Sequence, residues 1–316
     1  EIGVRLVGSE MCIRDRKLEA YRSSLSEEQL DAMVEKTKAL EAYQEAGEDP
    51  KALECIPMLK RSDIKREAAK IINEELTVDD SLFLYHDVCT NGIGYVDLMF
   101  KTDSIAPEQI PYLGLLKSVL GYVDTENYTY GELFNEINAN TGGINCGVEV
   151  FDRADSTEEF QAMFSVRGKA LYTKMDFLFK MIGEILNSSK LEDTKRLYEI
   201  VASVKSRAQV NLTGAGHSTA VLRAAAYSSP MAAFQDEMAG IGYYQFIEKL
   251  EKDFEQRKEE TVEELCKLMK KILRPENFMI SYTGERESLE TVQKLAGAVK
   301  AGLGTCLLYT SPSPRD

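Results

Sequence analysis

One short stretch of this chain gathers three kinds of metal donor. Residues 86–89 are His86, Asp87, Val88 and Cys89, which offer an imidazole, a carboxylate and a thiol. Successive side chains of a β-strand point to opposite faces, so His86 and Asp87 cannot chelate one ion if this apolar stretch is a strand. We therefore expect His86 to be a strand-end histidine with ordinary hydrogen-bond partners, not a ligand.

A second stretch resembles the turn that presents a nucleophilic serine. Residues 216–220 (GHSTA) are one position short of Gly-x-Ser-x-Gly. That turn follows a strand and needs a histidine later in the chain. No histidine follows His217, and the residues before Gly216 have a helical pattern. The sequence therefore predicts a helix start here and not a serine hydrolase.

Other patterns of charge and glycine do not indicate a catalytic site. The carboxylate-rich run 251–264 is interleaved with basic residues, which is typical of a solvated helix. Gly92 and Gly94 lack the context of a phosphate-binding loop. From the residues we expect no catalytic, cofactor-binding or metal-ligating side chain in this chain.

Composition narrows the class of protein. The formal net charge of −14 and the pI near 4.9 argue against a nucleic-acid or anionic-membrane partner, which would favour a basic face. No apolar run approaches the roughly 20 residues of a membrane span. The cysteines at 55, 89, 146 and 266 have no paired spacing, so we expect free thiols in a reducing, cytoplasmic compartment.

The stretch 82–166 organises the rest of the chain. Asn91-Gly92 is a strong hairpin signal between two strand-like runs, and Phe164 and Val166 belong to an alternating strand. Helices are expected from Pro107 to Gly121 and from Thr129, which has capping-box spacing to Glu132, to Gly143. The expected strands lie near 82–88, 93–101, 144–151, 159–167 and 277–283. This order predicts an α+β fold in which helices pack on one face of an antiparallel sheet.

The two ends have a different character. Residues 306–316 and 1–16 can be encoded by opposite strands of one sequencing adapter, so we expect both to be artefacts that pack against nothing substantial. Residues 17–80 are expected to form a helical hairpin linker, with a capped start at Ser26 and a helix from Ser62 through Ile72. Residues 81–305 are expected to form the α+β domain, and the whole is expected to be a fragment of a longer chain.

Several runs, taken in order, resemble the presequence-protease branch of the insulinase-like (pitrilysin) zinc metallopeptidases. They are 53–59 (LECIPML), 90–95 (TNGIGY), 111–116 (PYLGLL), 130–133 (YGEL) with 141–143 (TGG), and 216–220 (GHSTA) with 242–244 (GYY). The resemblance implies that 17–80 is linker and that the rest is the first domain of the carboxyl half, which is the non-catalytic half of such enzymes.

The resemblance also implies where zinc is bound. Family members hold it in the amino half, on an inverted His-x-x-Glu-His helix. Aligning the end of that helix with residues 118–121 places Leu113, Leu116 and Lys117 over the motif positions, and none of these can act as zinc ligand or general base. Zinc is therefore expected only in the missing amino-terminal half.

The implied partners are a short unstructured peptide substrate and the missing amino-terminal half and final domain, with no nucleic acid and no membrane. In this hypothesis the chain forms chamber wall and hinge of a zinc metalloendopeptidase and is inactive alone. The alternative is a non-peptidase scaffold or peptide-binding relative of the same fold.

Overall fold

The computed structural model describes residues 15–47, 50–67, 70, 72–156 and 158–304. The chain divides into two compact units, residues 1–69 and 70–316. Apart from Asp15 and Arg16, the adapter-like ends lie outside the described residues, so their expected lack of packing stays a prediction. Within the described ranges, no helix combines the length and hydropathy of a bilayer span.

Among its described residues, the first unit contains a helix over residues 15–23 and the longer helix α2 (Glu27–Glu45). Its start is capped as the sequence predicts: Gln29 N donates to the Ser26 hydroxyl at 3.3 Å, and Ser26 N donates to the Gln29 side chain at 2.9 Å. No side chain of α2 is buried. The shorter helices α3 (Pro50–Leu53) and η1 (Arg61–Asp63) follow it.

The helix expected from Ser62 through Ile72 is wrong. The described residues that follow η1 are not helical, and strand β1 begins at Glu74. β1 (Glu74–Val78) pairs with β2 (Ser81–Asp87) through a two-residue turn, Asp79-Asp80, with φ of 46° and 64°. Such turns usually carry Asn or Gly, because few other residues tolerate positive φ. The missing glycine concealed this hairpin in the sequence.

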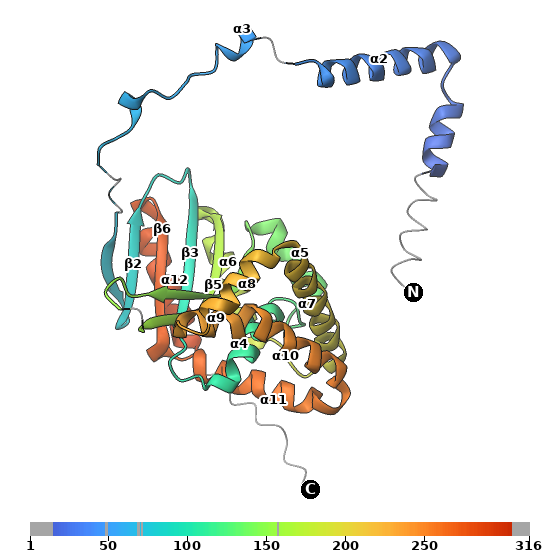
Figure 1. The fold of residues 1–316 in the computed structure, drawn as a ribbon. Helices are drawn as coiled ribbons and strands as arrows, with labels where there is room; N and C mark the ends of the chain where they lie inside the picture. Colours follow the sequence, from blue (N-terminus) through green and yellow to red (C-terminus); the bar gives the residue numbers. More distant parts are fainter. Residues whose placement is uncertain (1–14, 48–49, 68–69, 71, 157, 305–316) are drawn as a thin grey trace. The chain divides into compact units, whose positions relative to one another are not determined.

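Six strands form one sheet in the second unit, in the order β1-β2-β6-β3-β5-β4 (Figure 1). All neighbouring pairs are antiparallel except β2 and β6, which are parallel. The remaining strands are β3 (Ile93–Lys101), β4 (Ile144–Asp152), β5 (Phe160–Leu171) and β6 (Phe278–Gly284). The five predicted strands are all present, and the α+β class is confirmed.

The turn at Asn91-Gly92 is formed, but it does not join a hairpin. Both residues have positive φ, 54° and 81°, and Ile93 N donates to Thr90 O at 3.3 Å. β6 nevertheless lies between β2 and β3 and pairs with both. The sheet is therefore antiparallel as predicted except at β2, where a strand from late in the chain enters and pairs with it in parallel.

One face of the sheet forms the core. Val96, Leu98 and Phe100 share this face as predicted, and each is at most 3% exposed. Helices α6 (Met175–Ser188) and α12 (Leu289–Gly302) pack against it, and α6 comes so close that a Cβ at Gly168 would lie 2.6 Å from Leu178 Cδ1.

The two predicted helices between β3 and β4 are present. The first begins as a 3-10 turn at Pro107 and continues as α4 (Ile110–Val119), after which Gly121 takes the left-handed conformation with φ of 84°. The second, α5 (Tyr130–Asn140), has the predicted capping box between Thr129 and Glu132.

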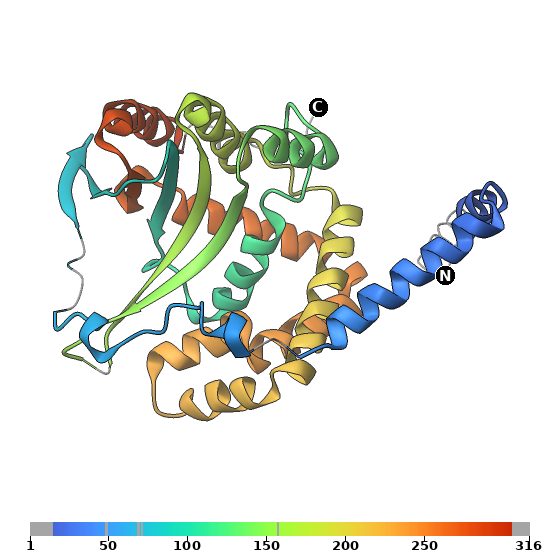
Figure 2. The same cartoon turned by 90° about the horizontal axis from the view of Figure 1, so that it is seen from above.

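A second group of helices surrounds α4. It comprises α7 (Thr194–Gly214), α8 (Gly216–Ala225), α9 (Pro230–Ala239), α10 (Ile241–Lys252) and α11 (Phe254–Ile272). α4 contacts α7, α9, α10 and α11, and it also reaches strand β4. Figure 2 shows α6 and α12 towards one end of the curved strands β4 and β5, with α8–α10 towards the other end.

Candidate functional site

The face of the sheet opposite to the core carries a polar hollow of about 450 Å³. Successive side chains of a strand point to opposite faces, so the residues next to each core residue point into this hollow's face of the sheet. The hollow is lined by Tyr95, Asp97, Gly142, Gly143, Asn145, Arg167, Lys169, Ser281 and Thr283, and also by Val96 and Gly168, which belong to the core-facing register of β3 and β5. These residues include neither histidine nor cysteine, and they offer mainly hydrogen-bond donors and acceptors.

An ion-pair network spans three strands beside the hollow. Asp97 on β3 and Arg167 on β5 are direct register partners, and Arg167 Nε donates to Asp97 Oδ2 at 2.7 Å. Arg167 Nη1 lies 3.0 Å from Glu149 Oε1 on β4. The other Asp97 oxygen, Oδ1, is buried and has no hydrogen-bond partner among the described residues.

Burial shifts the pKa of the charged groups in this region. It raises the pKa of Asp97, and the hydrogen bond and charge of Arg167 oppose that shift. It lowers the pKa of Lys117, and the negative charge of Glu149 opposes that shift. The charge of Glu149 thus acts on Lys117 of α4 as well as on Arg167.

The three positions aligned with the zinc motif occupy two environments. Leu113 and Leu116 are 0% and 1% exposed and belong to the hydrophobic core. Lys117 is half-buried on the same helix, near Glu149. A zinc ligand needs a lone pair facing the metal, and the two leucines have none while the lysine carries a positive charge. These side chains do not fit zinc, and the described residues contain no cluster of three or more His, Cys, Asp and Glu suited to a metal.

His86 has partners on both ring nitrogens. Its Nδ1 is 2.8 Å from Ile72 O, a carbonyl that can only accept, so Nδ1 carries the hydrogen and Nε2 accepts from Ser281 Oγ at 3.3 Å. The neighbouring Asp87 instead binds Arg286 Nε at 3.4 Å. His86 is therefore a hydrogen-bonded strand-end histidine.

His217 and Ser218 are exposed in the first turn of α8. The preceding element is helix α7, which ends at Gly214, so the strand that a nucleophile elbow requires is replaced by a helix. The four cysteines of the described chain are unpaired, as predicted: Cys55, Cys89, Cys146 and Cys266.

Glu285 forms a second polar centre, at the end of β6, that sequence reasoning missed. Its carboxylate accepts from the backbone N–H groups of Thr90, Asn91 and Gly92 at 2.9, 3.0 and 3.4 Å, and from the Tyr172 hydroxyl. These hydrogen bonds, that of Tyr172 above all, hold the pKa of Glu285 down to about 2. The carboxylate fixes the 90–92 turn to β6, which is a structural role.

The network at Asp97 also escaped sequence reasoning. The alternation in β3 and β5 does place Asp97 and Arg167 opposite to the core residues, which marks them as polar-face positions. Their pairing follows only from the register of two strands that are 70 residues apart.

Comparisons with known proteins place these observations in a family. The family described as "Peptidase M-16C associated" matches residues 13–250. Protein HypA of Clostridium perfringens is 34% identical over 279 residues, which are 88% of this chain and 28% of that protein. Presequence protease 1, chloroplastic/mitochondrial, of Arabidopsis thaliana is 27% identical over 277 residues, which are 88% of this chain and 26% of that protein. This chain thus spans little more than a quarter of either relative.

A solved structure agrees at the level of the fold. The crystal structure of a conserved protein from Enterococcus faecalis V583 has a TM-score of 0.52 and 13% identity, covering 72% of this chain and 52% of that one. Since the family match extends over most of the chain, and sequence and fold agree with it, the chain belongs to the Peptidase M-16C associated family, as a segment related to presequence proteases.

Proposed function

We propose that this chain is the linker and a non-catalytic domain of a longer zinc endopeptidase that degrades short unstructured peptides, in which it forms chamber wall and hinge. The observation that carries the proposal is the packing of α4. Where an active repeat would need zinc ligands and a general base, Leu113 and Leu116 fill the core and Lys117 lies near Glu149. In this proposal zinc belongs to another segment of the same polypeptide.

Two further observations support the role of a wall. The relatives named as presequence proteases are several times longer than the part that this chain matches. The zinc ligands and the general base can therefore belong to other segments of such a protein. The hollow on the open face offers Arg167, Lys169 and Asn145, whose donors suit the carbonyl groups of an extended peptide.

The test is elemental analysis and peptide cleavage with the purified chain. We expect no stoichiometric zinc and no cleavage from the chain alone, and chelator-sensitive cleavage after the amino half and the final domain are added. In that assembly His86→Ala, His217→Ala and Lys117→Met should all retain the zinc content, because none of the three is a ligand.

Two outcomes would contradict the proposal. One zinc per chain that is lost in His86→Ala would place a metal site in this domain. Coding sequence upstream that lacks a His-x-x-Glu-His helix would favour the non-peptidase relative of the same fold.

A further inference from the structure

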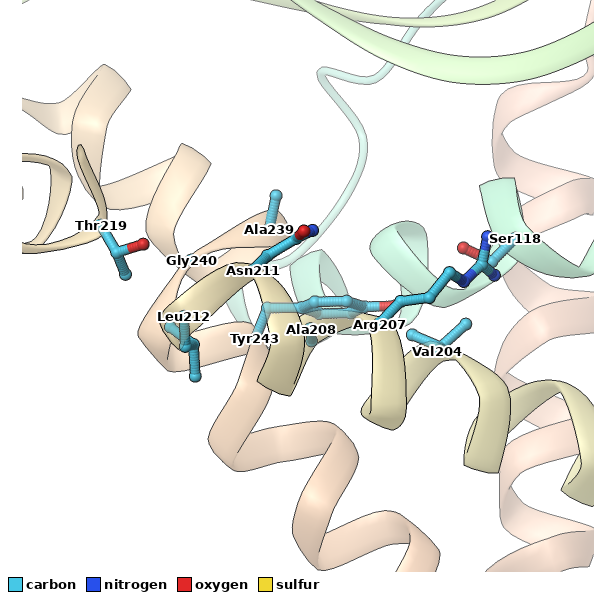
Figure 3. Close-up of a pocket in the computed structure, with 10 residues that line it drawn as sticks. All are labelled: Ser118, Val204, Arg207, Ala208, Asn211, Leu212, Thr219, Ala239, Gly240 and Tyr243. Atoms are coloured by element: carbon cyan, nitrogen blue, oxygen red, sulfur yellow. The ribbon is translucent and has the colours of Figure 1, made fainter. Parts of the chain in front are cut away.

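A cavity of about 250 Å³ lies between helices, away from the open face of the sheet. It is bounded by α4, α7, α8 and the junction of α9 with α10 (Figure 3). Its polar lining groups include Ser118, Arg207, Asn211 and Tyr243, and Val204 and Leu212 contribute apolar surface. No acidic residue lines it, although the chain carries a net charge of −14.

Tyr243 supplies a buried hydroxyl that lacks a partner. Its side chain is 5% exposed, and its Oη makes no hydrogen bond of good geometry with any described atom, although Ser118 lies close enough to influence it. Ser118 is nearby, but its hydroxyl donates to Gly114 O at 3.4 Å. A buried hydroxyl without a hydrogen-bond partner costs folding free energy. Such a group is therefore expected where a ligand or a water molecule forms the missing hydrogen bond.

Arg207 is exposed and supplies a cation that has no counter-ion in the part of the chain that the structure describes. Within the described ranges it makes no ion pair or hydrogen bond, whereas Arg223 and Arg196 bind Asp236 and Glu199. Figure 3 shows Tyr243 on α10 pointing towards the base of the Arg207 side chain on α7, whose guanidinium end overlaps Ser118 in this view. Asn211, one helical turn after Arg207, also lines the cavity.

We propose that this cavity binds a small monocarboxylate with a short apolar body, whose charged end lies between Arg207 and the Tyr243 hydroxyl. A planar carboxylate fits the fork of a guanidinium and leaves lone pairs for a hydroxyl donor. The apolar body contacts Val204 and Leu212, which line the same cavity. Such a ligand pairs two groups that are otherwise unpaired.

The single positive charge of Arg207 and the size of the cavity argue against larger or more highly charged ligands. One guanidinium balances one negative charge, so a phosphate dianion would be left partly uncompensated. The cavity of about 250 Å³ is smaller than the roughly 300–1,000 Å³ of pockets for drug-sized ligands, which suits a small ligand. Burial raises the pKa of Tyr243, against opposing effects of Ser118 and Arg207, so its hydroxyl stays a donor at neutral pH.

Calorimetric titration of the full chain tests the proposal, with 3-methylbutanoate as the probe. The isosteric 3-methylbutanamide and inorganic phosphate serve as ligand controls. We expect saturable binding of the carboxylate and none of the amide. Arg207→Gln and Tyr243→Phe should each weaken it by about tenfold, the effect of one hydrogen bond to a charged group. Arg274→Gln, which removes an exposed charge elsewhere, should leave it unchanged.

A second arm identifies the source of the carboxylate. An alanyl-leucine dipeptide that binds more tightly than 3-methylbutanoate would identify a peptide C-terminus, and the reverse order would identify a free acid. The C-terminally amidated dipeptide should not bind in either case.

Weaker binding by Tyr243→Phe would not be explained by misfolding. The variant keeps the ring that packs against Gly114 and removes only the unpartnered hydroxyl. Its melting temperature should equal or exceed that of the wild type. The proposal is overturned if binding does not saturate below about 10 mM, if the amide binds equally well, or if both cavity variants bind like the wild type. A destabilised Tyr243→Phe would also overturn it, since the hydroxyl would then have a partner within the protein.

Discussion

Asp236→Ala should destabilise the second unit by about 3 kcal/mol, as the loss of a buried cap and ion pair. Asp236 lies at the end of α9 and is 1% exposed. Its carboxylate accepts from Ile241 N at 3.0 Å, Gly242 N at 3.2 Å and Arg223 Nη1 at 2.6 Å. It thereby caps the start of α10 and joins α8 to it.

The size of this loss in folding free energy follows from the groups that the substitution leaves without a partner. Losing a helix cap costs about 1 kcal/mol, and leaving a buried N–H unpaired costs about 1–3 kcal/mol. The sum lies at the low end of the 3–5 kcal/mol seen when a buried ion pair loses one partner. The low end applies because the Arg223 side chain is 38% exposed, so water can solvate it after the change.

The assay is denaturant unfolding followed by circular dichroism. Glu237→Ala is the matched control: it removes the adjacent, exposed carboxylate and should stay within about 0.5 kcal/mol of the wild type. Arg223→Gln should cost less than Asp236→Ala, because the carboxylate keeps both backbone donors. A loss below about 1 kcal/mol for Asp236→Ala, or a larger loss for Arg223→Gln, would refute the reasoning.

Two further changes test the turn at residues 90–92 and the packing of α4. The pKa of Glu285 is held at about 2, below its ordinary 4.5, so its contribution to stability is complete above about pH 4.5 and is lost as the pH falls from there towards 2. Melting temperatures measured across this range should fall less steeply in Glu285→Gln than in the wild type, and parallel curves would contradict the assignment. Gly114→Ala should destabilise by about 2 kcal/mol in urea unfolding, because the added Cβ would lie 2.5 Å from Met238 O and 2.8 Å from Tyr243 Cε2. Gly131→Ala, where nothing lies within 4 Å, is the control that should be tolerated.

The sequence alone determined the local structure that helix caps, glycine stops and strand alternation encode. Capping boxes at Ser26 and Thr129 and the left-handed Gly121 depend on residues a few positions apart, so their patterns could be recognised without the fold. Apolar alternation likewise predicted which side of β3 and β5 faces the core. The family resemblance also came from short runs read in order, and the family match confirms it.

The tertiary structure decided whatever depends on residues distant in the chain. β6 enters between β2 and β3 although about 180 residues separate it from β3, and no local pattern encodes such a pairing. The Asp97–Arg167 pair requires the register of two strands, and the cavity at Arg207 and Tyr243 requires the packing of four helices. Local hydrogen bonds and alternation act over a few residues, whereas strand order and cavities arise from burial summed over the whole domain, which only the folded chain defines.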